Sequence, residues 1–160
     1  MKIKEGDKLP DATVVILEKD HKEISTSKIL NKDKVILFGL PGAFTPTCSN
    51  KHLPSFLKSA EELKKKDIKK VFCISVNDPF VMEAWGKAHN AGDKILMAGD
   101  PFCKFIKDIG ADVDKSERGL GIRSSRFTML VENSIIKEIK EEKDTASCEI
   151  SAAENFLKEI

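Results

Sequence analysis

The cysteine at position 48 lies in a segment whose residue types and spacing suit nucleophilic chemistry. The segment reads GLPGAFTPTCSNKH from Gly39 to His52, and it joins an apolar run to a stretch with helical spacing. Thr45 lies three residues before Cys48, where a dithiol enzyme of the C-x-x-C type carries its other cysteine. A threonine hydroxyl forms no disulfide, but it can hydrogen bond to a thiolate or to a bound oxygen. The spacing therefore favours attack by a single thiol over dithiol exchange, with a merely buried cysteine as the alternative.

The other three cysteines differ in their sequence surroundings. Cys73 lies inside the apolar run VFCISV, which favours a buried and inert thiol. Cys148 lies in the polar stretch KDTASCE, so we expect it to be exposed and mobile, and it is the candidate disulfide partner of Cys48. Cys103 is a weaker candidate partner. The cysteine spacings show no metal-ligand pairing with one another or with the histidines, so no metal site is predicted.

The three arginines form a cluster in a chain that otherwise uses lysine. Arg118, Arg123 and Arg126 are the only arginines among 27 basic residues. A lysine-rich sequence that keeps arginine in one place indicates a need for a planar, permanently charged fork of donors. Arg118 is expected to be a solvated loop charge.

Length and composition indicate one ordinary globular domain. The 160 residues are expected to form a single domain over 1–160, with 41% hydrophobic and 33% charged residues. The net charge of +1 gives no field that would attract nucleic acid or a membrane surface. The beginning of the sequence lacks the apolar core of a signal peptide, and no apolar run is long enough to span a bilayer. The expected location is the cytoplasm, with import into an organelle left open.

Hydrophobic patterning predicts an α/β fold with a mixed sheet and helices on both faces. Strands are predicted at 13–18, 34–40, 70–76, 94–98, 126–132 and 135–140, with a hairpin turn at 133–134. Helices are predicted from Ser49, from Pro79, over 101–109 and from Ser151. This order fits a thioredoxin-like fold. In that architecture Cys48 begins a helix after a central strand, where free N–H groups and the helix dipole favour a thiolate.

Several side chains have expected places in these helices. Phe102 is expected to point inward from the helix over 101–109, and Trp85 to belong to the core. SAAE from Ser151 has the pattern of a capping box. Pro54 lies early in the helix after Ser49, where it is expected to bend it.

The segment GLPGAFTPTCSNKHLPSF closely resembles the active-site segment of the type II peroxiredoxins, which include the atypical two-cysteine subgroup. The peroxiredoxin signature P-x-x-x-T-x-x-C is met by Pro41, Thr45 and Cys48. The later segments VFCISVNDPFVMEAW and GLGIRSSRFTMLVE also resemble the family, in the same order. Ser55 departs from the glycine expected in HLPGF, at a position that concerns packing.

The resemblance implies a thiol peroxidase that reduces hydrogen peroxide and organic hydroperoxides without a metal, haem or flavin cofactor. Cys48 would attack the peroxide and become a sulfenic acid. Thr45 would supply a hydroxyl donor, and Pro41 would shield the sulfenic acid. Arg126 matches the catalytic arginine of the family, and Arg123 matches a frequent second arginine that supports the site or a dimer.

His52 lies one helical turn after Cys48, so it can face the same pocket. Two interpretations stay open for it, a packing residue and a proton carrier.

The resemblance also implies partners. The oxidised enzyme would be recycled by glutathione with glutaredoxin or by thioredoxin. Phe44 and Phe80 would line a homodimer interface, whereas the sequence without the resemblance would place them in the core. In the atypical two-cysteine subgroup a resolving cysteine precedes the last helix. Cys148 lies near that place, although the family pattern would put the cysteine near Ile150.

Two rival functions remain. One is a thioredoxin-fold redox sensor, binding protein or holdase without significant turnover. The other is a dithiol oxidoreductase, which Thr45 disfavours.

Overall fold

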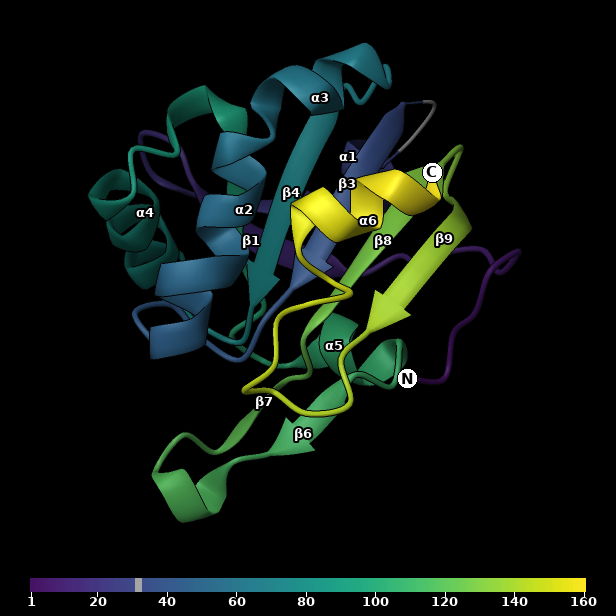
Figure 1. Cartoon of the computed structure of the whole chain (residues 1–160). Helices are drawn as coiled ribbons and strands as arrows, with labels where there is room; N and C mark the ends of the chain where they lie inside the picture. Colours follow the sequence, from purple (N-terminus) through teal and green to yellow (C-terminus); the bar gives the residue numbers. More distant parts are fainter. Residues whose placement is uncertain (31–32) are drawn as a thin grey trace.

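A seven-stranded mixed sheet forms the centre of the computed structural model, which describes residues 1–30 and 33–160 (Figure 1). The strand order is β2-β1-β5-β4-β3-β8-β9. The strands span β1 Thr13–Leu17, β2 His21–Ser25, β3 Lys34–Gly39, β4 Lys70–Ser75, β5 Leu96–Gly99, β8 Phe127–Glu132 and β9 Ile135–Glu141.

The three central strands β3, β4 and β5 run parallel to one another, whereas the neighbours outside them are antiparallel. Residues 35–39 of β3 and 71–75 of β4 are buried throughout, as expected of parallel strands covered on both faces. The predicted hairpin joins β8 to β9, and both turn residues, Asn133 and Ser134, have positive φ. Such φ values belong to the tight turns that match the twist of two antiparallel strands.

Helices cover the sheet on two faces, as the sequence predicts. One core joins the sheet to α2 Leu53–Lys58, α3 Ala60–Lys65, α4 Pro79–Ala88 and α6 Ala153–Glu159. The other core lies between the sheet and α1 Thr26–Ile29 and α5 Lys104–Asp108. Trp85 is fully buried in the first core, where its Nε1 donates to the Ser49 hydroxyl at 3.0 Å.

A small second sheet extends from the main body (Figure 1). It pairs β6 Asp112–Asp114 with β7 Ile122–Ser124, and the 3₁₀ turn Ser116–Arg118 lies between them. The hydrophobic pattern predicts no strand in this stretch. Strands of three residues leave too short a pattern for alternation to reveal them.

The helix predicted from Ser49 is divided into three parts. A π-helical turn, η1, spans Cys48–His52, α2 follows directly, and Ser59 separates α2 from α3. Pro54 occupies the first turn of α2, where its missing N–H costs little. The structure shows a widened, π-helical turn directly before the proline, and the bend expected at Pro54 stays a prediction. Single π-helical turns of this kind occur often at functional sites.

The helix predicted over 101–109 begins later than expected. The prediction that Phe102 points inward is wrong. Phe102 is 86% exposed, and Cys103 adopts a left-handed conformation with φ 54°. The helix begins at Lys104 because the Asp100 carboxylate accepts hydrogen bonds from the backbone N–H groups of Lys104 and Ile106. These bonds satisfy donors that a helix start leaves free.

The capping box predicted at Ser151 is also wrong. The Ser151 hydroxyl donates to the Glu142 carboxylate at 2.8 Å, and α6 begins at Ala153 with no side-chain cap. A buried carboxylate brought near by the fold therefore competes successfully for a hydroxyl that the local sequence assigns to the helix.

Two elements at the other end of the sheet were not predicted. β2 reads HKEIS, and its polar residues suit an edge strand but give little hydrophobic signal. The single turn α1 follows it at once. Pairing along all five residues of β1 holds β2 in place.

Candidate active site

The fold places Cys48 at the edge of the sheet where the parallel strands end. β3 ends at Gly39, and the following loop leads into η1, whose first residue is Cys48. The Cys48 side chain is fully buried. The loops after β4 and β5 leave the sheet at the same edge, because parallel strands have their carboxyl ends together. This is the edge at which ligands bind in open α/β sheets.

Arg126 lies beside Cys48. It directly precedes β8, and only 1% of its surface is exposed. Its Nη2 lies 3.4 Å from the Cys48 Sγ and donates to the Thr145 carbonyl at 2.8 Å. Its Nη1 lies 3.2 Å from the His52 Nδ1. A permanent positive charge at this distance stabilises a negatively charged sulfur.

These hydrogen bonds do not use every donor of the Arg126 guanidinium. Among the described residues, the Arg126 Nε is the buried side-chain nitrogen or oxygen without a hydrogen-bond partner. A buried donor without a partner is costly, so such donors are rare in native structures, and each one calls for an explanation such as a functional role. Only the family resemblance predicts Arg126 and Cys48 at one site, because 77 residues separate them in the chain.

A surface pocket of about 410 Å³ opens over this group. Its lining combines the loop before η1, the second sheet and the loop after β9: Pro41, Thr45, Pro46, Thr47, Lys115, Arg118, Leu120, Arg126, Asp144, Thr145 and Ala146. Pro41, Thr45 and Arg126 of the predicted site therefore share one pocket. The pocket can admit a small molecule to the edge of the thiol site.

Thr45 makes a hydrogen bond that alters its expected role. Its hydroxyl donates to the Gly42 carbonyl at 2.7 Å. The expected role of this hydroxyl is to donate to the thiolate or to a bound oxygen. With its hydrogen already used, the oxygen of Thr45 is free to accept a hydrogen bond instead.

Arg123 lies behind the loop that carries Pro41. Its Nε donates to the Leu120 carbonyl at 2.7 Å, and its Nη1 donates to the Pro41 carbonyl at 3.4 Å. Arg123 thus braces the pocket wall without touching the sulfur. Arg118 is exposed at the pocket rim, in agreement with the solvated position expected for it.

His52 is completely buried and faces Arg126. Burial lowers the pKa of His52 to about 3, and the positive charge of Arg126 adds to this shift. The ring therefore stays neutral at physiological pH. Of the two interpretations, a proton carrier would require an imidazole that ionises near neutral pH, and His52 does not.

Cys148 does not have the exposed, mobile position predicted for it. It is 7% exposed, and burial raises the pKa of its thiol above the usual range. Its loop is held at several points. Thr145 accepts from Arg126, and the Asp144 carboxylate accepts from the backbone N–H groups of Ala146 and Ser147. The polar sequence of this loop predicted mobility. The prediction is wrong because the polar groups form the hydrogen bonds that hold the loop in place.

The two remaining thiols are buried as well. Cys73 on β4 is fully buried, as predicted. Burial is the main cause that raises the pKa of its thiol, and the electrostatic interaction with the nearby Cys48 raises it further. Cys103 is 5% exposed, and burial also raises the pKa of its thiol.

Three polar residues that help to build the site gave no signal in the sequence. The Asn77 side-chain oxygen accepts from the Ala43 N–H at 3.0 Å and fixes the loop before η1. Thr128 lies under His52, and Glu142 holds the backbone N–H groups of Glu149 and Ser151. The only available hint was a polar residue at or next to the end of an apolar strand.

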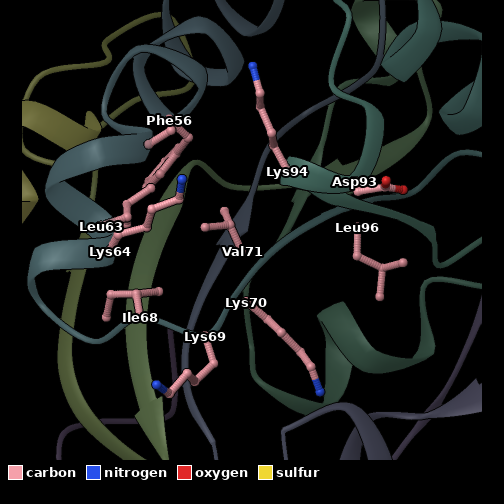
Figure 2. Close-up of a pocket in the computed structure, with 11 residues that line it drawn as sticks. Phe56, Leu63, Lys64, Ile68, Lys69, Lys70, Val71, Asp93, Lys94 and Leu96 are labelled. Atoms are coloured by element: carbon pink, nitrogen blue, oxygen red, sulfur yellow. The ribbon is translucent and has the colours of Figure 1, made fainter.

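Other features of the described residues lie apart from the thiol site. A pocket of about 330 Å³ combines apolar residues such as Leu63 and Val71 with several lysines (Figure 2). It lies where β4 begins, at the sheet edge opposite Cys48. In the described part of the chain no three His, Cys, Asp or Glu side chains are grouped to hold a metal, and no helix is long and apolar enough to cross a membrane.

Comparisons with known proteins agree with the resemblance seen in the sequence. Residues 4–157 match the Redoxin family. Peroxiredoxin-2D of Arabidopsis thaliana is 41% identical over 157 residues, which cover 97% of this chain and 96% of that protein.

Solved structures give the same result. Reduced Prx3 from Vibrio vulnificus in complex with H2O2 matches with a TM-score of 0.93 and 39% identity, over 98% of each chain. A Plasmodium falciparum antioxidant protein, described as a 1-Cys peroxiredoxin, matches with a TM-score of 0.89 and 31% identity, over 98% of this chain and 100% of that one.

The low pKa of His52 predicts a loss of stability in mild acid. Below pH 6.5 the unfolded chain binds a proton at this histidine, whereas the folded protein does not until pH falls to about 3. The free energy of unfolding should therefore decrease by about 1.4 kcal/mol per pH unit in this window, or about 2 kcal/mol between pH 7.5 and pH 5.0. Urea unfolding at the two pH values measures the change. In His52→Asn the decrease should be clearly smaller, and an equal decrease in both proteins would contradict the assignment.

Proposed function

Because this chain belongs to the type II peroxiredoxins and is a thiol peroxidase, we propose that Cys48 is the attacking thiol and Arg126 the charged donor beside it. The observation that supports this most directly is the 3.4 Å distance between the Arg126 Nη2 and the Cys48 Sγ. Both side chains are buried, so solvent does not screen the interaction.

The proposed reaction transfers one oxygen atom from the peroxide to sulfur. The Cys48 thiolate attacks one peroxide oxygen, and a sulfur–oxygen bond forms as the oxygen–oxygen bond breaks. Cys48 becomes a sulfenic acid. The other oxygen leaves with the electron pair of the broken bond and takes up a proton, giving water from hydrogen peroxide or an alcohol from an organic hydroperoxide. N–H groups of Arg126 face the negative charge that develops in this step.

Thr45 and Pro41 complete the proposed site in different ways. The Thr45 oxygen can accept a hydrogen bond from the peroxide O–H, since its own hydrogen is held by Gly42. Pro41 has no N–H, so it forms a pocket wall that adds no competing donor. Arg123 holds the Pro41 carbonyl and is proposed to support this wall.

An external thiol is proposed to regenerate the enzyme, either glutathione with glutaredoxin or thioredoxin. Attack of this thiol on the sulfenic acid gives a mixed disulfide and water, and a second thiol then releases Cys48. The buried state of Cys73 and Cys148 supports an external thiol over an internal one, because burial raises the pKa of both thiols. A thiol with a raised pKa has little of the nucleophilic thiolate form.

A homodimer is proposed at the same edge of the sheet. Phe44 and Phe80 follow β3 and β4, and they are 58% and 62% exposed. The hydrogen bond from Ala43 to Asn77 draws these two loops together. Exposed aromatic side chains on neighbouring loops are typical of a protein interface, and a second copy of this chain would cover them.

The alternative function, a redox sensor or holdase without turnover, is less well supported, because the similar curated proteins are named peroxiredoxins, which are thiol peroxidases. The cytoplasmic location stays a prediction.

Substitutions at Cys48 and Arg126 test the proposed chemistry. Cys48→Ser should abolish peroxide turnover, because a serine hydroxyl is not ionised at neutral pH. Arg126→Lys should keep the charge but lose the fork of donors, with a loss of about 2.7–4 kcal/mol of transition-state stabilisation, or roughly 100- to 1000-fold in rate. Stopped-flow measurement of peroxide reduction gives both rates. Full turnover by Cys48→Ser would exclude Cys48 as the nucleophile.

The oxidised enzyme distinguishes external from internal resolution. After one equivalent of peroxide without added thiol, we expect a sulfenic acid on Cys48 that dimedone traps. Mass spectrometry of the digested protein identifies the adduct. Cys148→Ser should leave its yield unchanged. A peptide linking Cys48 to Cys148 or to Cys73 would contradict resolution by an external thiol.

The dimer proposal predicts a change in molecular mass. The double variant Phe44→Glu, Phe80→Glu should sediment as a monomer at protein concentrations where the unaltered chain sediments as a dimer, because it places charges in the apolar contact. Ile150→Glu is the matched control, since Ile150 is 46% exposed but lies beside α6. A monomeric unaltered chain, or a double variant that still dimerises, would refute this interface.

A further inference from the structure

His52 holds Arg126 in a way that the proposed reaction does not yet use. The Arg126 charge is buried, yet none of the ion pairs in the described part of the chain includes it. Its acceptors are the Cys48 sulfur, the Thr145 carbonyl and the His52 ring. Buried charges are usually paired with an opposite charge. Here only the sulfur can carry one, as a thiolate, and the neutral character of the other two acceptors requires an explanation.

The hydrogen bonds around the His52 ring determine which nitrogen carries the hydrogen. The Thr128 hydroxyl donates to the Ser151 carbonyl at 2.7 Å. The His52 Nε2 lies 3.2 Å from that hydroxyl oxygen and 3.2 Å from the same carbonyl. Both can only accept from the ring, so the Nε2 must carry the hydrogen. In the neutral ring the Nδ1 then has a free lone pair, which accepts from the Arg126 Nη1.

The ring itself has little freedom to move. Phe38 from β3 and Phe56 from α2 lie 4.9 Å and 5.8 Å from it, measured between ring centroids. Phe38 and Phe56 also stack on each other. Of the side chains that form described hydrogen bonds or ring contacts with the His52 ring, namely Arg126, Thr128, Phe38 and Phe56, Arg126 is the charged one. The low pKa of His52 keeps the ring in the neutral form that this arrangement needs.

We propose that His52 is a positioning residue, which fixes the Arg126 guanidinium through a neutral acceptor and so leaves its positive charge for the Cys48 sulfur and the departing oxygen. A carboxylate in this place would hold Arg126 at least as firmly. However, it would neutralise the charge of the guanidinium and add a negative charge near the thiolate. A neutral imidazole orients the guanidinium without this loss. The inference rests on the proposed function, since it assigns Arg126 to the thiol chemistry.

Three substitutions of His52 separate its two properties, the acceptor that orients Arg126 and the absence of charge. In His52→Asn the amide oxygen can take the place of the Nδ1 acceptor. In His52→Gln the longer side chain puts its amide near the Nε2 position, so the acceptor for Arg126 is lost. In His52→Asp the acceptor is kept but carries a negative charge. All three are smaller than or similar in size to histidine, and Phe56→Leu serves as a control for packing in the same cluster.

The measurement is the second-order rate constant for hydrogen peroxide as a function of pH, by stopped flow, together with urea unfolding at neutral pH. His52→Gln should react about 10- to 100-fold more slowly than the unaltered chain, the range expected for one hydrogen bond to a charged group. The increase of its rate constant with pH should begin at a higher pH than in the unaltered chain. His52→Asn should recover part of that loss. His52→Asp should be as slow as His52→Gln or slower. Phe56→Leu should lose stability without any shift in the pH profile.

Other outcomes would overturn the inference. Rates for Asn, Gln and Asp that simply follow the stability of each variant would make His52 a packing residue. An unshifted pH profile in His52→Gln would show that Arg126 needs no brace. The Arg126→Lys variant measured alongside separates the two proposals: if it reacts as fast as the unaltered chain, the assigned role of Arg126 fails. If only the His52 variants are unaffected, the fault lies with the positioning role alone.

Discussion

A buried guanidinium held by the reactive sulfur and by two neutral groups is the constraint on which the site depends. Removing a charge from water is costly, and the cost must be offset by well-formed hydrogen bonds. Arg126 obtains them from a sulfur and an imidazole, both in η1, and from a carbonyl in the loop before α6. The surrounding structure is arranged to keep these three acceptors in place.

The sheet supplies the rigid part of that arrangement. Antiparallel pairing of β3 with β8 places the end of β3 opposite the beginning of β8. Gly39 pairs with Phe127 in this register, so the loop toward Cys48 leaves the sheet beside Arg126. The π-helical turn then contains both Cys48 and His52, and both side chains reach the same guanidinium. Two cores, one on each face, hold the sheet in position.

The loop before α6 forms the third part of the site and explains the character of Cys148. Glu142 accepts three hydrogen bonds from Glu149 and Ser151, and Thr47 donates to the Ala146 carbonyl. The loop therefore lies against both the helix that begins with Cys48 and the arginine. A loop held so firmly keeps its cysteine buried. Resolution by an internal disulfide would have to break several of these contacts.

The sequence by itself determined the elements whose signals are local. Hydrophobic periodicity indicated the central strands, the longer helices and their distribution on two faces, and the motif around Cys48 indicated a single-thiol chemistry. Local patterns gave wrong predictions at Phe102 and Ser151, where hydrogen bonds to Asp100 and Glu142 override the local helix pattern. The prediction for Cys148 was also wrong, because its polar surroundings did not make it exposed.

Only the tertiary structure decided which groups meet. The contact of His52 with Arg126, the neutral state of that histidine and the use of the Thr45 hydrogen by Gly42 all depend on the folded arrangement. The physical reason is that burial and hydrogen-bond partners set the charge and donor state of a polar group. For Arg126 and His52 both come from residues far apart in the chain, and for Thr45 they depend on how its loop folds.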